Sequence, residues 1–233
     1  MYAMPRRTPI DRLDRLVDVA TTVFLDRGYR RTQMADVAAA LEVAKGTLYL
    51  AVASKEALFD LVVRFADGPR PIPPLPLPVP TPEPGATLRL VREELVRQQA
   101  PPGLTAALAR TRVSDVRAEL EEIAGDLFDV LSRNRRRVKL ADRAALDWPE
   151  LASLWFGGAR EGLVALLARY FDDRIRRRRM RPVPDVEVAA RQVIETCVFC
   201  AVHRHWDARP QTVDDAVARA TALHFVVNAL AKE

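Results

Sequence analysis

The chain has 233 residues, of which 49% are hydrophobic and 29% charged, with a net charge of +5 and a pI near 9.6. These values are typical of a soluble globular protein with one large core or two smaller ones. They permit a polyanionic partner without requiring one. No apolar run reaches the roughly 20 residues of a membrane-spanning helix, and the charged N-terminus lacks a signal peptide. We therefore expect no membrane partner and a cytoplasmic location.

The first 66 residues contain four predicted helices separated by short turns. We expect them over residues 9–27, from about 34 to 41, from 45 to about 52, and from 55 to about 65. Apolar residues recur three or four positions apart in each, as on the buried face of a helix. Thr8 and Ser54 can cap the first and fourth helices, and Gly28 can end the first. Three short helices and a connector predict a helix-turn-helix domain.

The next segment, residues 67–86, contains "GPRPIPPLPLPVPTPEPG", with proline at nearly every second position. Proline removes backbone donors and favours extended polyproline II, which excludes helix and sheet here. Apolar residues interleave the prolines at Ile72, Leu75, Leu77 and Val79, which a solvated linker would not need. We expect a stiff strap that lies against its own subunit or a partner subunit. A ligand for a proline-binding module is the alternative.

Residues 87–233 again show helical patterns. The predicted helices cover about 88–96, 104–109, 116–137, 147 to 170 or beyond, 186–206 and 213–230, the last begun by Thr212. No run of alternating β-branched residues competes with them. The fold class is therefore all-α: an N-terminal three-helix helix-turn-helix domain, joined by a connector helix and the Pro-rich strap to a C-terminal helical bundle. The expected boundaries are 1–66, 67–86 and 87–233.

Three motifs carry a resemblance to a known family. Phe24-x-x-x-Gly28-Tyr29, Lys45-Gly46-Thr47-Leu48-Tyr49 and Ser54-Lys55-Glu56-Ala57-Leu58 occur in order. With them, residues 15–62 resemble the DNA-binding domain of the TetR family of transcriptional regulators. The resemblance covers about the first quarter of the chain. It implies a homodimer that places each third helix in a DNA major groove, and a variable C-terminal domain that binds a small molecule and dimerises through its last two helices, about 186–206 and 213–230.

The resemblance also implies the DNA contacts. They are Thr32, Gln33, Lys45, Gly46, Thr47, Tyr49 and Lys55. Lys45 and Tyr49 lie one turn apart on one helical face. Gly46 lets the backbone approach a groove edge. We add Leu50, whose side chain could contact a thymine methyl group.

Four residues depart from the family pattern. Glu42 stands where a glycine is usual, Ala44 replaces a capping Ser or Thr, Ala51 replaces a His or aromatic residue, and Val52 replaces a packing Phe. A left-handed non-glycine residue costs roughly 1–2 kcal/mol, and a lost cap about 1 kcal/mol. Residues 1–66 carry ten basic and eight acidic side chains, a modest net +2. We therefore expect a functional DNA-binding domain whose contacts with the DNA phosphates are weakened.

Aromatic residues in the C-terminal half suggest a ligand pocket. The candidate lining is Phe128, Trp155, Phe156, Phe199 and His203. Ordinary core packing is the alternative for most of them. The helix over 213–230 is apolar around more than half of its circumference, which favours burial against a second subunit.

Other chemistry-bearing residues have structural interpretations. Cys197 and Cys200 lie within an apolar helix, so we expect buried thiols rather than a redox or metal pair. His203 and His205 point to different sides of a helix and should not share a metal ion. The arginine run over residues 174–181 is expected to be a solvated helix end. We expect no cofactor and no metal.

The function predicted is a ligand-responsive, DNA-binding transcriptional regulator. We expect a repressor that binds a palindromic double-stranded DNA operator as a dimer and is released by an unidentified small molecule. One alternative is a TetR-like dimer with degenerate DNA binding that acts as a ligand- or partner-binding protein. Another is a helical-bundle enzyme, for which the sequence offers neither a nucleophile with a matched base nor paired carboxylates.

Overall fold

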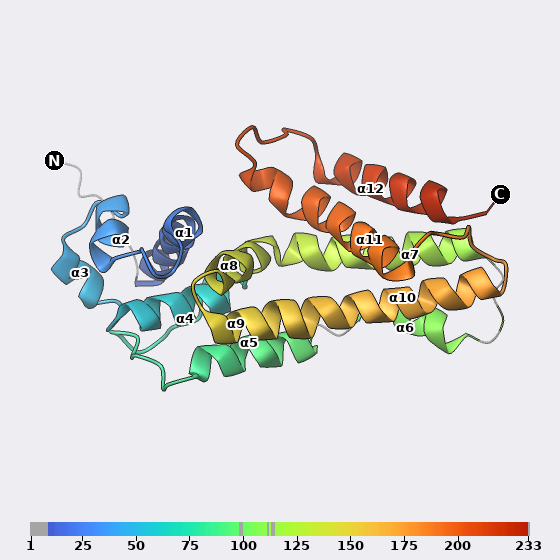
Figure 1. Cartoon of the computed structure of the whole chain (residues 1–233). Helices are drawn as coiled ribbons and strands as arrows, with labels where there is room; N and C mark the ends of the chain where they lie inside the picture. The colour runs from blue at the N-terminus through green and yellow to red at the C-terminus, as the bar shows by residue number, and fades with distance from the viewer. Residues whose placement is uncertain (1–8, 98–99, 111, 113–114, 233) are drawn as a thin grey trace. The chain divides into compact units, whose positions relative to one another are not determined.

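The computed structural model describes residues 9–97, 100–110, 112 and 115–232, with side chains from residue 13 onward. Every regular element in these ranges is helical, which confirms the all-α fold class (Figure 1). The helices are α1 (Pro9–Arg27), α2 (Met34–Ala40), α3 (Lys45–Tyr49), α4 (Lys55–Phe65), α5 (Ala86–Arg97), α6 (Pro102–Ala109), α7 (Val116–Arg133), α8 (Arg135–Ala145), α9 (Pro149–Ala152), the π-helical η1 (Ser153–Arg160), α10 (Glu161–Arg176), α11 (Val186–Ala201), the 3₁₀ turn η2 (His203–Trp206) and α12 (Asp215–Leu230). Thr8, the predicted cap of the first helix, lies outside the described residues.

The chain forms two compact units. Unit 1 contains the described residues up to 93 together with 139–152, and unit 2 contains those of 94–138 and 153–232. The chain therefore passes between the units within α5, within α8, and between α9 and η1. The Pro-rich strap belongs to unit 1.

The core of unit 1 follows the predicted helical stripes. Leu16, Val17 and Phe24 of α1 are buried, as are Leu58 and Leu61 of α4. Phe59, also buried, meets Phe24 edge to face at a ring-centroid distance of 5.2 Å. Burial of these apolar side chains holds α1 against α4.

The strap packs along unit 1 through backbone groups and several side chains. Ile72 is only 1% exposed, and its N–H donates to the Asp14 carboxylate at 3.0 Å. Arg70 reaches the same part of α1 through Asp18 at 3.0 Å. Leu77, in contrast, is half exposed. Of the two positions that the sequence left open, the strap takes the one against its own subunit.

Unit 2 is a bundle of α6, α7, α10, α11 and α12, and α11 and α12 run beside α7 (Figure 1). Its main core includes Leu120 and Ile123 of α7, Phe171 of α10, Ile194 of α11 and Val226 of α12. One helical run, Pro149–Arg176, is long and apolar enough by length and composition to cross a membrane. Its second half, α10, supplies core side chains of this bundle.

A buried ion pair crosses this bundle, where the sequence suggested only a solvated helix end. Arg174 is 1% exposed, and its Nε lies 2.8 Å from Oε2 of the buried Glu119 on α7. Tyr170 donates its hydroxyl proton to the same carboxylate at 3.1 Å, and the Arg174 guanidinium also reaches the Ala107 carbonyl. The prediction is wrong for Arg174 because its partner is distant in sequence. It holds for residues 176–179, which are exposed.

A second cluster joins the start of α12 to α8 and η2. The Asp215 carboxylate accepts from Arg135 at 2.5 Å, pairs with Arg204, and lies 3.5 Å from Nε2 of His205. Burial, followed by the charges of Arg135 and Arg204, lowers the pKa of His205 below 6.5. The imidazole is therefore neutral in the folded protein at neutral pH.

Several predicted helix boundaries were wrong. The helix expected over 186–206 ends at Ala201 and is followed by the 3₁₀ turn η2. The helix from Lys45 ends at Tyr49 rather than near Val52. The helix expected over 116–137 breaks at Asn134, whose backbone leaves the helical conformation, and α8 follows. The last helix is capped by Asp214, which accepts from the Ala216 N–H, rather than by Thr212.

Both cysteines are free. Cys197 is fully buried, and burial, followed by the proximity of Cys200, raises the pKa of its thiol to about 12. Such a thiol remains protonated and unreactive at neutral pH. The interpretation of Cys197 as a structural thiol is confirmed, whereas Cys200 is partly exposed.

Candidate DNA-binding site

The helix α3 divides into a buried side and an exposed side. Leu48 is 2% exposed, and Val52, just after the helix, is fully buried. On the opposite side, the exposed residues are Lys45, Gly46, Thr47, Tyr49 and Leu50. Leu50 is 72% exposed, which leaves its methyl groups accessible for an apolar contact.

Small and cationic groups shape this exposed side. Within the part of the chain that the structure describes, no atom beyond the local helix lies within 4 Å of the position that a Cβ of Gly46 would occupy. The Lys45 ammonium lies 6.0 Å from the ring centroid of Tyr49. The Lys45 ammonium can bind a phosphate, and the Tyr49 phenol can contact a base edge. The bare backbone at Gly46 allows the helix to approach the groove closely.

The turn before α3 carries a strained residue. Glu42 has φ of +60°, the left-handed conformation expected at a position where the TetR family usually has a glycine. Its N–H donates to the Ala39 carbonyl and the Val43 N–H to the Ala38 carbonyl, both at 3.0 Å. These two bonds form a Schellman motif that ends α2. Ala44 is the N-cap of α3 and supplies no side-chain hydrogen bond, as predicted.

The strap clamps the chain immediately after α3. Val79 forms a parallel bridge beside Val52: its N–H donates to the Ala51 carbonyl at 2.8 Å, and its carbonyl accepts from the Ala53 N–H at 2.9 Å. Ser54 then caps α4 through the Ala57 N–H at 3.1 Å. The strap thus supplies backbone support at the positions where Ala51 and Val52 offer only small side chains.

Three further candidates make contacts inside unit 1. Lys55 donates from Nζ to the carbonyls of Tyr29 at 3.2 Å and Arg30 at 3.4 Å. Thr32 is buried, and its hydroxyl donates to the Gly28 carbonyl at 2.7 Å. Gln33 is the N-cap of α2 and is exposed, with its N–H bonded to Asp36. Lys55 and Thr32 therefore stabilise the α1–α2 turn. Their contact with DNA stays a prediction.

The arrangement of α2, a tight turn and an exposed α3 is that of a helix-turn-helix. Residues 16–62 match the family model described as bacterial regulatory proteins, tetR family. Residues 16–62 therefore form a TetR-family DNA-binding domain. The match identifies this domain as the DNA-binding domain of a bacterial transcriptional regulator, as the sequence predicted.

Solved TetR-type structures share the fold beyond this domain. The ketosteroid regulator KstR2 of Mycobacterium tuberculosis is 17% identical, with a TM-score of 0.56, and the match covers 100% of both chains. A tetR-family regulatory protein from Rhodococcus RHA1 is 14% identical, with a TM-score of 0.53, over 97% of this chain and 99% of that one. AibR, solved with isovaleryl coenzyme A and operator DNA, is 17% identical, with a TM-score of 0.52, over 93% and 98%. A search of curated proteins found no match to this chain.

The structure brings two of the five predicted ligand-pocket residues, Phe128 and Trp155, into one cluster. Phe128 is buried in a small core cluster against which Trp155 packs. The Cζ atom of Arg160 lies over the Phe156 ring, 5.6 Å from the ring centroid. Phe199 is 43% exposed on α11. His203 is half-buried in η2. None of the five lines the two cavities described below.

The cavity in unit 2 lies along α6 and α7. Its volume is about 650 Å³, and its lining includes Arg97, Thr105, Asp126 and Arg133. Sequence reasoning missed it because short, charged or small residues line it rather than aromatic ones.

The strap clamp was missed for a related reason. Val79 acts through its backbone, and no side-chain pattern reports a backbone contact. The interleaved apolar residues were the only available signal, and they indicated packing without its location.

Proposed function

We propose that this TetR-family regulator is a ligand-responsive repressor that binds a palindromic operator as a homodimer. The observation that carries the DNA-binding part is the exposed side of α3, where a cation, a phenol, a glycine and a leucine form an uninterrupted face. Each dimer would place two such helices in successive major grooves, about one helical turn apart. We expect the protein to act in the cytoplasm.

The proposed dimer interface is the exposed side of α11 and α12. Val188 and Phe199 on α11 are 60% and 43% exposed, and Val217 and Phe225 on α12 are 55% and 67% exposed. Four large apolar side chains on two neighbouring helices exceed what a monomer surface normally shows. A second copy that presents the same two helices would bury them in a four-helix interface.

The proposed effector binds in unit 2. The groove along α6 and α7 has the volume of a small-molecule site, and the aromatic group around Phe128 and Trp155 stays a prediction for the same role. An effector shifts operator affinity only through different affinities for the DNA-bound and free conformations.

Selection from a random pool of double-stranded DNA tests the DNA-binding proposal. We expect enrichment of an inverted repeat, with binding that weakens as salt rises. Absence of any sequence preference would instead support a dimer with degenerate DNA binding.

The dimer is tested by sedimentation of two matched variants. Val217→Glu places a charge on the proposed interface, and Val96→Glu places the same charge on an equally exposed valine of α5, which is 69% exposed. We expect Val217→Glu to sediment as a monomer and to lose operator affinity, and Val96→Glu to do neither. Equal behaviour of the two variants would contradict the proposed interface.

A further inference from the structure

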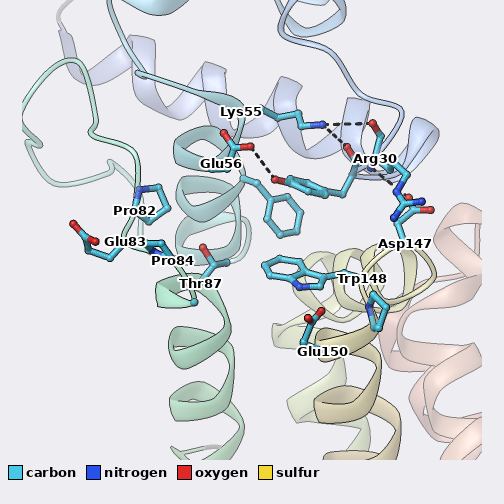
Figure 2. Close-up of a pocket in the computed structure, with 14 residues that line it drawn as sticks. Arg30, Lys55, Glu56, Pro82, Glu83, Pro84, Thr87, Asp147, Trp148 and Glu150 are labelled. Atoms are coloured by element: carbon cyan, nitrogen blue, oxygen red, sulfur yellow. Dashed lines mark hydrogen bonds between the residues drawn. The ribbon is translucent and has the colours of Figure 1, made fainter.

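A second cavity lies within unit 1, apart from the exposed side of α3. Its volume is about 490 Å³, and it is lined by the α1–α2 turn, the start of α4, the end of the strap and residues 147–150 (Figure 2). The strap contributes Pro82, Glu83, Pro84 and Gly85 to the wall, only a few residues after Val79, which clamps the chain following α3.

Three aromatic rings form the apolar wall of this cavity. The ring centroids of Tyr29 and Phe59 lie 4.7 Å apart, those of Tyr29 and Trp148 5.9 Å, and those of Phe59 and Trp148 6.3 Å. The faces of such rings are electron-rich and attract cations. The protein itself shows this, since the Lys55 ammonium lies 4.6 Å from the centroid of the Tyr29 ring.

Acidic groups outnumber basic groups in the lining. Four carboxylates, Glu56, Glu83, Asp147 and Glu150, face two cations, Arg30 and Lys55. The Lys55 ammonium is already held by two backbone carbonyls. Asp147 accepts from the Arg30 N–H at 3.3 Å.

The remaining three carboxylates have no cation of their own. Glu56 accepts a hydrogen bond from the Tyr29 hydroxyl at 3.5 Å. Among the described residues, Glu56, Glu83 and Glu150 form no salt bridge of 4.0 Å or less. The lining therefore combines electron-rich ring faces with an excess of negative charge, and both disfavour an anionic ligand.

We propose that this cavity binds a small organic cation, with its apolar body against Tyr29, Phe59 and Trp148 and its ammonium group in the negative potential of the exposed Glu56, Glu83 and Glu150. The bound cation would touch both the strap and the start of α4, which follow and support the recognition helix. It would thus act on the reading domain itself, separately from an effector in unit 2.

Benzyltrimethylammonium is the probe, with benzyl alcohol and benzenesulfonate as its neutral and anionic counterparts. The background variant Trp155→Phe/Trp206→Phe leaves Trp148 as the only tryptophan, so its fluorescence reports occupancy in the absence of DNA. We expect saturable binding of the cation, at least about tenfold weaker binding of benzyl alcohol, and none of the sulfonate.

Two triple variants separate the local carboxylates from the total charge. Glu56→Gln/Glu83→Gln/Glu150→Gln should weaken cation binding about tenfold or more, whereas Glu93→Gln/Glu121→Gln/Glu187→Gln, at exposed positions elsewhere, should not. Equal affinity for cation and alcohol, equal effects of the two triple variants, or no saturation up to about 10 mM would each overturn the proposal. Because no DNA is present, the result is independent of operator binding.

Discussion

Glu42 and Arg178 form a natural pair for testing backbone strain and helix electrostatics. Glu42 follows α2 and Arg178 follows α10, with φ of +60° and +59°. The hydrogen-bond pattern is the same at both: the Arg178 N–H donates to the Ile175 carbonyl at 2.8 Å, and the Arg179 N–H to the Arg174 carbonyl at 2.9 Å. Both helices thus end in a Schellman motif without glycine, but with opposite charges at the left-handed position.

Glycine at either position should release the same strain. A left-handed non-glycine residue costs about 1–2 kcal/mol, and the extra freedom of glycine in the unfolded chain returns about 0.5–1 kcal/mol of that. The charge then separates the two variants, since an anion at a helix C-terminus is unfavourable and a cation favourable by about 0.3–1 kcal/mol each. We expect Glu42→Gly to raise the free energy of unfolding by about 1 kcal/mol, and Arg178→Gly to change it little.

Urea unfolding measures both effects. Trp148 reports on unit 1 in the Trp155→Phe/Trp206→Phe background, and Trp155 and Trp206 report on unit 2 in a Trp148→Phe background. Glu42→Gln, which keeps the strain and removes the charge, should recover about a third to half of the gain of Glu42→Gly. If Glu42→Gly is destabilising, or if Arg178→Gly stabilises as much as Glu42→Gly, the reasoning from strain and helix charge is refuted.

Three further predictions concern the strap, the buried ion pair and acid stability. Ile72→Ala should lower the unfolding free energy of unit 1 by about 2–4 kcal/mol, and Leu77→Ala at the half-exposed strap position should barely change it, by the same Trp148 transition. Arg174→Met removes the 2.8 Å partner of the buried Glu119, which keeps the Tyr170 hydroxyl and the Arg110 guanidinium at 3.5 Å, and should cost about 3–5 kcal/mol in denaturant melts; Glu119→Leu added to it should restore most of this loss. Because the pKa of His205 is lowered in the folded state, the unfolded chain binds the extra proton, so stability should be full above pH 6.5 and fall below it. Urea midpoints across this range should show a slope that His205→Gln flattens, and a midpoint that rises as pH falls would contradict the assignment.

Helical periodicity predicted most of the helices of unit 1. The apolar stripe of α1 and the Ser54 cap of α4 depend on neighbours three or four positions away, which a sequence displays directly. The left-handed conformation of Glu42 was predicted from the resemblance instead, because the TetR family usually has a glycine at this position.

The parts that could not be predicted depend on partners far along the chain. Arg174 looks like one solvated arginine among several, and only the fold brings Glu119 to it across fifty-five positions. Similarly, Trp148 belongs by sequence to the C-terminal half, yet its ring packs against Tyr29 within unit 1. A single sequence carries no local pattern for such pairs.

The strap shows a third kind of limit. Polyproline II has no internal hydrogen bonds, so its side-chain pattern does not reveal which backbone groups will find partners. Ile72 is buried and Leu77 is not, although both are apolar residues flanked by prolines.

The most direct test compares Lys45→Ala with Lys232→Ala in binding a selected operator duplex at two salt concentrations. Both variants lose one lysine charge from an exposed position, one on α3 and one near the C-terminus. We expect Lys45→Ala to weaken binding and to reduce the slope of log affinity against log salt by about one, and Lys232→Ala to leave both unchanged. Equal affinities and salt slopes for the two variants would contradict the assignment of α3 as the recognition helix.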